Sequence, residues 1–253
     1  MTVPKLSLEG KVAIVTGASR GIGRAIALGF AEAGADVVVC SRTLPDLEKV
    51  AAEIRAQGRR SLAVEVNIAV KSEVDNLVQT TVGEFGTIDI LVNNAAINIM
   101  RSLIDLREDG WDKVMNVGLK GYFLCSQAAA RVMMERKSGN IINMASSAAT
   151  KAAPALGAYS IVKAGVVMLT RVFAVELARY NIRVNAIGPS LVRTGFSQPL
   201  WGNPDMLKGI EAGIPLGRIA EAEDIVTVAL FLASDLSSYI TGQTIYADGG
   251  TMA

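Results

Sequence analysis

The sequence of 253 residues contains no histidine. This absence excludes the Ser-His-Asp triad, the Cys-His pair and nearly every catalytic zinc site, so we expect no metal centre. Any proton transfer must instead use a tyrosine, lysine, aspartate, glutamate or cysteine side chain.

The sequence also has few cysteines and little net charge. The two cysteines, Cys40 and Cys125, lie far apart and are too few for a disulfide framework, which predicts a reducing compartment, the cytoplasm. The formal net charge is only +1, and the basic residues are scattered, so no nucleic-acid partner is expected. No apolar run reaches the roughly 18 residues that span a bilayer. Residues 1–10 include Lys5 and Glu9 and do not resemble a signal peptide, so no membrane partner is expected.

Short apolar runs alternate with longer segments of helical periodicity along the whole chain. These runs do not alternate with polar residues, a pattern typical of parallel strands covered on both faces. Seven strands are expected, at residues 12–15, 37–40, 62–66, 88–92, 140–144, 182–187 and 244–246. The sequence therefore predicts an α/β protein: one Rossmann-type, doubly wound domain over residues 1–253, with helices on both faces of a seven-stranded parallel sheet.

Helices are expected between these strands, at residues 24–33, 47–57, 74–85, 118–136 and 154–178. Gly34, Gly58 and Gly86 follow or end the first three, where helix termini favour glycine. In a doubly wound sheet the ligand lies outside the carboxyl ends of the strands. The segments that follow strands should therefore form the site: residues 16–23, 41–42, 93–96, 145–147 and 188–194.

A glycine-rich turn follows the first strand and leads into a helix. Glycines allow a sharp turn and a close approach of backbone N–H groups to a pyrophosphate, and the helix N-terminus favours an anion. At the first strand–helix junction this pattern favours a dinucleotide over a simple turn. The expected contacts come from Gly17, Ser19, Arg20, Gly21, Ile22 and Gly23.

The end of the second strand indicates which dinucleotide binds. An acid there holds a ribose 2′-hydroxyl, whereas an arginine accommodates a 2′-phosphate. Here the strand ends in Ser41 and Arg42, and Arg20 in the glycine turn can reach the same phosphate. These residues favour NADP(H) over NAD(H), although both arginines could also simply point into water.

Tyr159 and Lys163 are four residues apart in an expected helix, so both side chains project from one face. The pattern Tyr-x-x-x-Lys often arises by chance, but Ser146 ends the preceding strand and can meet both groups. A lysine ammonium favours tyrosinate and should lower the pKa of Tyr159 towards neutrality. The Ser146 hydroxyl can donate to a carbonyl oxygen that gains negative charge. The set predicts hydride transfer between a nicotinamide and a ketone or secondary alcohol.

The spacing G-x-x-x-G-x-G, followed by Ser146, Tyr159 and Lys163, resembles the short-chain dehydrogenase/reductase family in its classical form, over essentially the whole chain. The resemblance implies that Lys163 also holds the nicotinamide ribose, and that Asn116 supports a proton relay through water. It adds cofactor contacts from Asn67, Asn93, Ala95, Pro189, Val192 and Thr194. It also implies a homotetramer formed through the long helices. Three positions depart from the family pattern: Ala96 replaces a glycine, Asn67 replaces an acid, and Gly188-Pro189 replaces Pro-Gly.

The expected substrate pocket is apolar, which favours a hydrophobic or aromatic ketone. Its residues are Ile97, Ala148, Leu156, Leu191, Phe196, Leu200 and Trp201, with a lid over residues 190–213. Residues 95–98 and 196–201 resemble NADPH-dependent carbonyl/retinal reductases of the dehydrogenase/reductase member 4 type. Three alternatives remain: a polyol or sugar dehydrogenase, a non-catalytic NADP-binding regulator, and a 3-oxoacyl-carrier-protein reductase. For the last, Arg131 matches one carrier-reading arginine, but Val175 replaces the other.

Overall fold

The computed structural model describes residues 6–152 and 155–253. They form one parallel sheet of seven strands in the order β3-β2-β1-β4-β5-β6-β7, which confirms the predicted fold class. The strands are β1 (Val12–Thr16), β2 (Asp36–Ser41), β3 (Ser61–Glu65), β4 (Ile90–Asn93), β5 (Gly139–Met144), β6 (Ile182–Pro189) and β7 (Thr244–Ala247). The strand order reverses between β1 and β4, and this reversal places a ligand site there.

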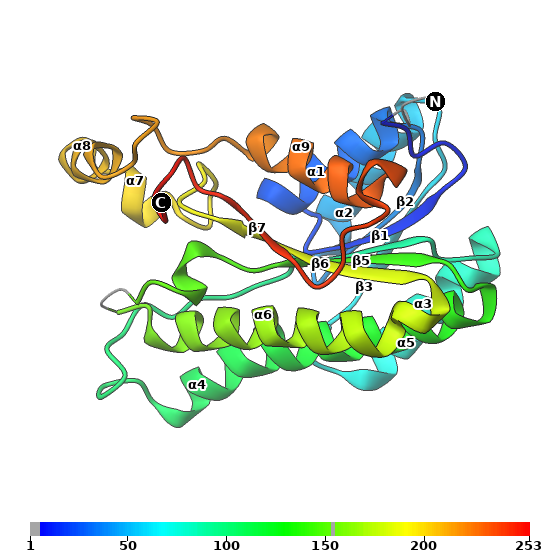
Figure 1. Ribbon diagram of the computed structural model, residues 1–253, viewed down its shortest axis with the longest axis horizontal. Coiled ribbons are helices and arrows are strands. Elements are labelled where there is room, and N and C mark those ends of the chain that lie inside the picture. The colour runs from blue at the N-terminus through cyan, green and yellow to red at the C-terminus, as the bar shows by residue number, and fades with distance from the viewer. Residues whose placement is uncertain (1–5, 153–154) are drawn as a thin grey trace.

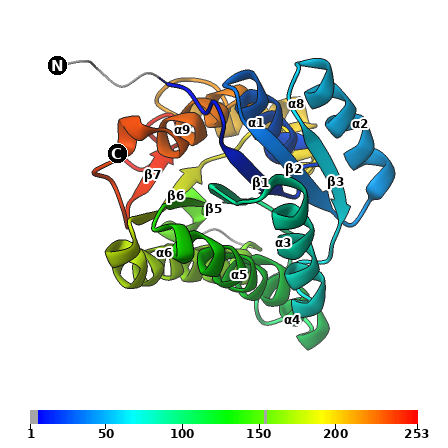
Figure 2. The same cartoon turned by 90° about the vertical axis from the view of Figure 1, so that its right-hand side faces the viewer.

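Two helical layers enclose the sheet (Figures 1 and 2). One layer contains α1 (Gly21–Glu32), α2 (Leu44–Ala56) and α9 (Ala222–Ala233). The other contains α3 (Lys71–Phe85), α4 (Glu108–Met115), α5 (Gly121–Arg136) and α6 (Gly157–Leu177). The two short helices α7 (Gln198–Trp201) and α8 (Pro204–Ala212) lie at the left end of Figure 1. Each layer buries its own apolar core against one face of the sheet, as expected for strands that are apolar on both faces.

All five predicted helices begin three residues away from their expected starts. Helices α1, α2 and α3 begin three residues earlier, and α5 and α6 begin three residues later. The helix expected from residue 118 is preceded by α4 and by a π-helical turn at Asn116–Lys120, and α5 begins only at Gly121. The helix expected from residue 154 begins at Gly157. Pro154 lies outside the described residues, as do Met1 to Lys5 of the N-terminal segment. Gly34, Gly58 and Gly86 all have positive φ angles, in agreement with their expected role at helix ends.

The predicted fourth strand is shortened at its start. β4 begins at Ile90 rather than Ile88, because Asp89 uses its side chain to accept a hydrogen bond from the Val12 backbone N–H at 2.9 Å. Within residues 6–152 and 155–253 no helix has the length and apolar content that a membrane span requires.

Candidate active site

A cavity of about 570 Å³ lies at the carboxyl ends of the strands, at the end of the molecule where α7 and α8 lie (Figure 1). The glycine turn after β1 lines it, together with the ends of β2 and β5, the segment after β4 and the segment from Pro189 to Leu200. These are the segments that the doubly wound topology predicts.

The glycine turn brings its backbone close to the segment after β4. Gly17 and Gly21 have φ angles of 66° and 58°, which side-chain-bearing residues rarely adopt. A Cβ on Gly17 would lie 2.8 Å from Ala95 Cα, and a Cβ on Gly23 would lie 2.4 Å from the Gly17 oxygen. Glycine is therefore required here for the turn and for helix α1 to lie against it.

The start of α1 fits a phosphate. Arg20, the residue before the helix, makes no capping bond with its side chain, so the first-turn N–H groups remain available to an anion. Gly21 and Ile22 line the cavity. The residues present therefore fit a dinucleotide pyrophosphate.

The same cavity is lined by the three residues predicted to select the group at the ribose 2′ position of the cofactor, namely Arg20, Ser41 and Arg42. Neither arginine forms an ion pair with a carboxylate among the described residues. Asp46 also lines this wall, and its carboxylate is paired with Lys49 at 3.1 Å. This acid was not predicted, because it lies in α2 rather than at the strand end. The local balance of charge still favours an anion.

Ser146 is the last residue before a short 3₁₀ turn, Ser147–Ala149, and it is 9% exposed. Its Oγ accepts a hydrogen bond from the Ala148 N–H at 3.1 Å and donates to the Pro189 carbonyl at 3.4 Å. The bond to Pro189 joins the end of β5 to the end of β6, and the two bonds together fix the hydroxyl at the cavity wall.

Tyr159 and Lys163 extend from the first turns of α6 into the same cavity. Lys163 is 1% exposed, and its Nζ donates to the Met144 carbonyl at 2.5 Å. The Nζ lies 5.5 Å from the centre of the Tyr159 ring. The Tyr159 ring also lies 6.2 Å from the Phe196 ring, measured between centroids. The lysine, the tyrosine and an apolar residue are thus neighbours in one wall.

Burial sets the charge state of both groups. Desolvation raises the pKa of Tyr159 to about 12, with the Ser146 hydroxyl acting in the opposite direction. Desolvation also lowers the pKa of Lys163 to about 7. The sequence predicts a lowered pKa for Tyr159, and this direction is wrong for the protein without a bound ligand, because the loss of hydration outweighs the hydrogen bond with Ser146.

Most of the predicted site residues line this one cavity. Besides the groups already named, the cofactor candidates Ser19, Asn67, Ala95, Pro189, Val192 and Thr194 do so. The substrate candidates Ile97, Ala148, Leu156, Leu191, Phe196 and Leu200 do so as well. Ala96 also lines the cavity, and its φ is not positive, so the alanine at this position causes no backbone strain.

Four predicted residues do not line the cavity. Gly23 packs behind the turn, as its close contacts show. Asn93 is fully buried and donates to Ser126 Oγ at 2.9 Å and to Asn143 Oδ1 at 2.8 Å. It therefore holds strands and helices together, and its side chain is not available to a ligand.

The other two, Asn116 and Trp201, lie in helices whose orientation cannot be predicted from sequence patterns. Asn116 occupies the π turn, and its side chain makes no hydrogen bond within the described part of the chain. The Trp201 Nε1 donates to the Thr194 carbonyl and to Ser197 Oγ, both at 3.1 Å, while its ring lies 5.1 Å from the Arg193 guanidinium. Trp201 thus fixes the segment before α7.

The cavity also contains residues that were not predicted. Asn98, Met100 and Ile210 line it, and the last two extend the apolar wall. Met100 follows the Asn93–Ala96 motif closely enough to have been proposed from the sequence. Ile210 comes from α8, and only the packing of that helix brings it to the site.

Comparison with known proteins agrees with this geometry. The family described as "Enoyl-(Acyl carrier protein) reductase" matches residues 17–252. The 3-oxoacyl-[acyl-carrier-protein] reductase of Synechocystis sp. is 41% identical over 246 residues, covering 96% of this chain and 98% of the relative. The (2S)-[(R)-hydroxy(phenyl)methyl]succinyl-CoA dehydrogenase subunit BbsD of Thauera aromatica is 42% identical over 250 residues, covering 97% and 98%.

Solved structures agree with the family. A putative short-chain alcohol dehydrogenase from Sinorhizobium meliloti 1021 superposes with a TM-score of 0.95 at 39% identity, covering 98% of this chain and 99% of the other. A gluconate 5-dehydrogenase from Burkholderia cenocepacia J2315, in complex with NADP and tartrate, has a TM-score of 0.95 at 33% identity and 98% coverage of both chains. The chain therefore belongs to the short-chain dehydrogenase/reductase family and is an oxidoreductase that acts on CH–OH groups.

Proposed function

We propose that the protein is an NADP(H)-dependent reductase of 3-oxoacyl thioesters. The observation that carries the proposal is the placement of Ser146, Tyr159 and Lys163 in one cavity with an apolar wall that fits an acyl chain. Both curated relatives are named for thioester substrates, one on an acyl carrier protein and one on CoA. The proposal replaces the expected carbonyl reductase as the leading function.

When bound in this cavity, NADPH would supply the hydride that reduces the 3-oxo carbon. Ser146 donates a hydrogen bond to the carbonyl oxygen as negative charge develops there. Tyr159 donates its proton to the same oxygen, and its raised pKa of about 12 keeps the hydroxyl protonated at neutral pH. The Lys163 ammonium stabilises the tyrosinate that remains, and it would hold the nicotinamide ribose.

NADP(H) is proposed as the cofactor because Arg20 and Arg42 both line the end of the cavity that would hold the adenosine. Each charge-assisted contact to a 2′-phosphate contributes about 1.5–3 kcal/mol. The gluconate 5-dehydrogenase of the same fold was solved with NADP, which supports this choice.

Two other oxidoreductase functions have weaker support. A polyol or sugar dehydrogenase would need polar groups around the substrate, whereas Ile97, Leu156, Phe196 and Leu200 line this cavity. A carbonyl reductase for aromatic ketones fits the same wall, but neither curated relative named above has that function. A purely regulatory NADP-binding protein would not need Ser146, Tyr159 and Lys163 together.

Steady-state kinetics with NADPH test the proposal. We expect acetoacetyl-CoA or a 3-oxoacyl carrier protein to be reduced with a kcat/KM at least about tenfold above an aromatic ketone or a polyol-derived ketone, a difference of about 1.4 kcal/mol. A preference for either of the last two would reject the thioester assignment. The carrier protein and CoA should differ little, because the place of the second carrier-reading arginine is occupied by Val175, which is 81% exposed.

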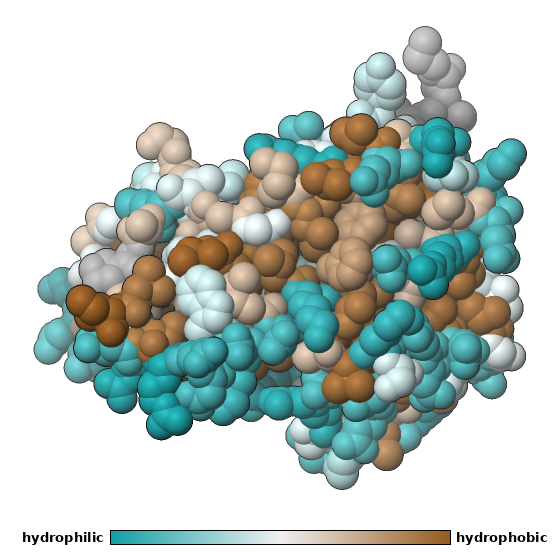
Figure 3. Space-filling view, turned by 90° about the horizontal axis from the view of Figure 1, so that it is seen from below, coloured by the Kyte–Doolittle hydropathy of each residue, from teal (hydrophilic) through white to brown (hydrophobic). Residues whose placement is uncertain are grey.

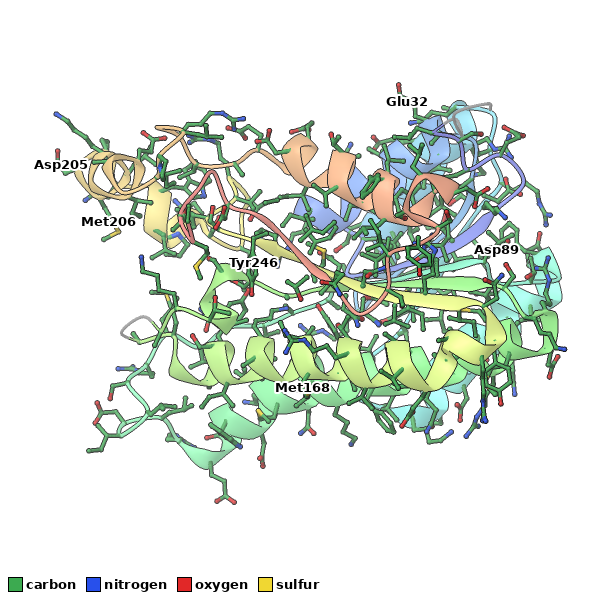
Figure 4. The ribbon with its side chains drawn as sticks, viewed as in Figure 1. Glu32, Asp89, Met168, Asp205, Met206 and Tyr246 are labelled. Atoms are coloured by element: carbon green, nitrogen blue, oxygen red, sulfur yellow. The ribbon has the colours of Figure 1, made fainter. Side chains whose placement is uncertain are left out.

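We further propose that the protein forms a homotetramer through α5 and α6. Phe123, Met168, Val172 and Val175 are exposed large apolar residues on these helices. Apolar side chains gather over this layer in Figure 3, and Met168 projects from α6 away from the sheet in Figure 4. Covering such a surface is favourable in water. Light scattering coupled to size-exclusion chromatography should give about four times the mass of the 26.6 kDa chain.

A further inference from the structure

Lys163 is a buried cation without an acidic partner. It is 1% exposed and forms no ion pair with any carboxylate of the described residues. Its Nζ donates to the Met144 carbonyl at 2.5 Å and to the Tyr122 hydroxyl at 3.4 Å. A buried ammonium is costly unless its donors are satisfied, so these two acceptors determine where the charge lies.

Tyr122 is fully buried and comes from α5. The Lys163 Nζ lies 5.1 Å from the centre of the Tyr122 ring and 5.5 Å from the centre of the Tyr159 ring. Both distances fall within the range in which an aromatic face attracts a cation. Tyr122 thus offers the ammonium both a hydroxyl acceptor and an aromatic ring, while Tyr159 contributes a second ring.

Close packing between the helices brings Tyr122 to this position. A Cβ added to Gly118, in the π turn before α5, would lie 2.5 Å from Val162 Cγ1 on α6. Val162 is the residue before Lys163, so only a glycine at 118 allows this approach. The hydroxyl of Tyr122 also reaches the Met144 carbonyl, at 3.5 Å, and therefore shares that acceptor with Lys163.

We propose that Tyr122 is a positioning residue that holds the Lys163 ammonium beside Tyr159 and the nicotinamide ribose. It accepts a hydrogen bond from Nζ and covers the charge with its ring. The inference rests on the role of Lys163 in the proposed function, but it does not depend on which carbonyl compound is the substrate.

The groups around Lys163 determine in which direction the loss of the Tyr122 hydroxyl should shift the pKa of Lys163. The titratable groups close to Lys163 are Tyr159 on its own helix and Tyr122 on α5. Cys125 lies near Tyr122, and the Ser146 hydroxyl is hydrogen-bonded to Tyr159. None of these is charged at neutral pH, and no charged side chain shifts the pKa of Lys163. Removing the Tyr122 hydroxyl removes an acceptor that favours the charged form, so the pKa of Lys163 should fall further.

The test is a fluorescence titration of NADPH against the full chain and the variant Tyr122→Phe, from about pH 6 to about pH 9. Tyr180→Phe, a tyrosine outside the cavity, is the matched control. We expect similar Kd values for all three proteins near pH 6, where Lys163 is charged, and a Kd about three- to tenfold higher for Tyr122→Phe near pH 8. For any substrate that turns over, the pH profile of alcohol oxidation should move to higher pH, because tyrosinate then forms less readily.

Superimposable pH profiles of Kd for Tyr122→Phe and the parent would overturn the proposal. If Tyr122→Phe lowers the melting temperature so much that binding cannot be measured, Tyr122→Met fills the space with a flexible apolar side chain and is held to the same criterion. The titration contains no carbonyl substrate. If the parent reduces no thioester but the pH profile of the NADPH Kd still differs between Tyr122→Phe and the parent, only the thioester function is contradicted.

Discussion

The two ends of the cavity are constructed in different ways. At the cofactor end the backbone forms the surface: Gly17 and Gly21 adopt positive φ angles, and the first turn of α1 is exposed to the ligand. At the substrate end side chains form the surface, and several of them come from the segment around α7 and α8. The backbone turn can be predicted from a short glycine pattern in the sequence. The wall of side chains depends on how the helices pack and cannot be predicted in the same way.

The largest expected effect lies where the two ends meet. Tyr159→Phe should lower kcat by about 10²–10⁴-fold, the usual contribution of a positioned proton donor. The Kd of NADPH should change little, because the phenyl ring still packs against Phe196. Stopped-flow reduction of acetoacetyl-CoA and NADPH fluorescence measure the two quantities, with Tyr180→Phe as the control. Turnover close to that of the parent would remove Tyr159 from the mechanism.

A methyl group at the cofactor end should impair binding strongly. Gly23→Ala places a Cβ 2.4 Å from the Gly17 oxygen, so the turn must move and the Kd of NADPH should rise about tenfold or more. Gly83→Ala is the control, because beyond the backbone of its own helix no described atom lies within 4 Å of its added Cβ. Calorimetric titration should find unchanged affinity for the control. Equal affinity for Gly23→Ala would mean that the close approach of α1 to the turn is not needed.

Charge reversal at the same end should change which cofactor is preferred. Arg42→Asp removes a cation beside the proposed 2′-phosphate and adds an acid that can hold a 2′-hydroxyl. We expect the ratio of kcat/KM for NADPH to that for NADH to fall by about tenfold or more. If the parent itself uses both cofactors equally, the assignment of Arg20 and Arg42 to a 2′-phosphate is wrong.

Much of the cofactor end, but less of the substrate end, could be predicted from the sequence. Apolar strand runs and the glycine turn depend on local chemistry, and they placed the cavity correctly. Asn93 ends a strand in a recognisable motif, yet its amide is used by Ser126 and Asn143 in the core. Trp201 was expected in the pocket because it is large and apolar, but its N–H has hydrogen-bond partners in the segment before α7. The charge state of Tyr159 could not be predicted from the sequence either, because burial sets its pKa.

The substrate end should respond with a smaller and more specific change. Leu200→Ala removes part of the apolar wall, and the KM for a long 3-oxoacyl thioester should rise about three- to tenfold, as expected for the loss of one to two buried methylene contacts. The Kd of NADPH should be unaffected. Leu207→Ala is the matched control, since Leu207 lies in α8 outside the cavity wall. Identical effects of the two substitutions would indicate that α7 does not contact the substrate.

The smallest effect is expected at Asn116. Its side chain does not line the cavity, so Asn116→Ala should lower kcat by less than about threefold, well below the usual contribution of a group that transfers protons. Steady-state kinetics across the pH range would check this. A loss of a hundredfold with unchanged melting temperature would restore the relay that the family resemblance implies.

The π turn at Asn116–Lys120 has a consequence for chain length. A π turn is equivalent to one extra residue inserted into an α-helix, and each residue of a regular helix advances the next side chain by about 100°. The wider π turn absorbs that extra residue, so deleting one residue here would make the helix regular and leave α4 and α5 in nearly the same phase, with Tyr122 still facing Lys163. Inserting one residue directly before Tyr122, in the regular part of α5, would instead rotate the rest of that helix by about 100° and turn Tyr122 away from the buried ammonium. The π turn should therefore tolerate the loss of one residue much better than the start of α5 tolerates the gain of one.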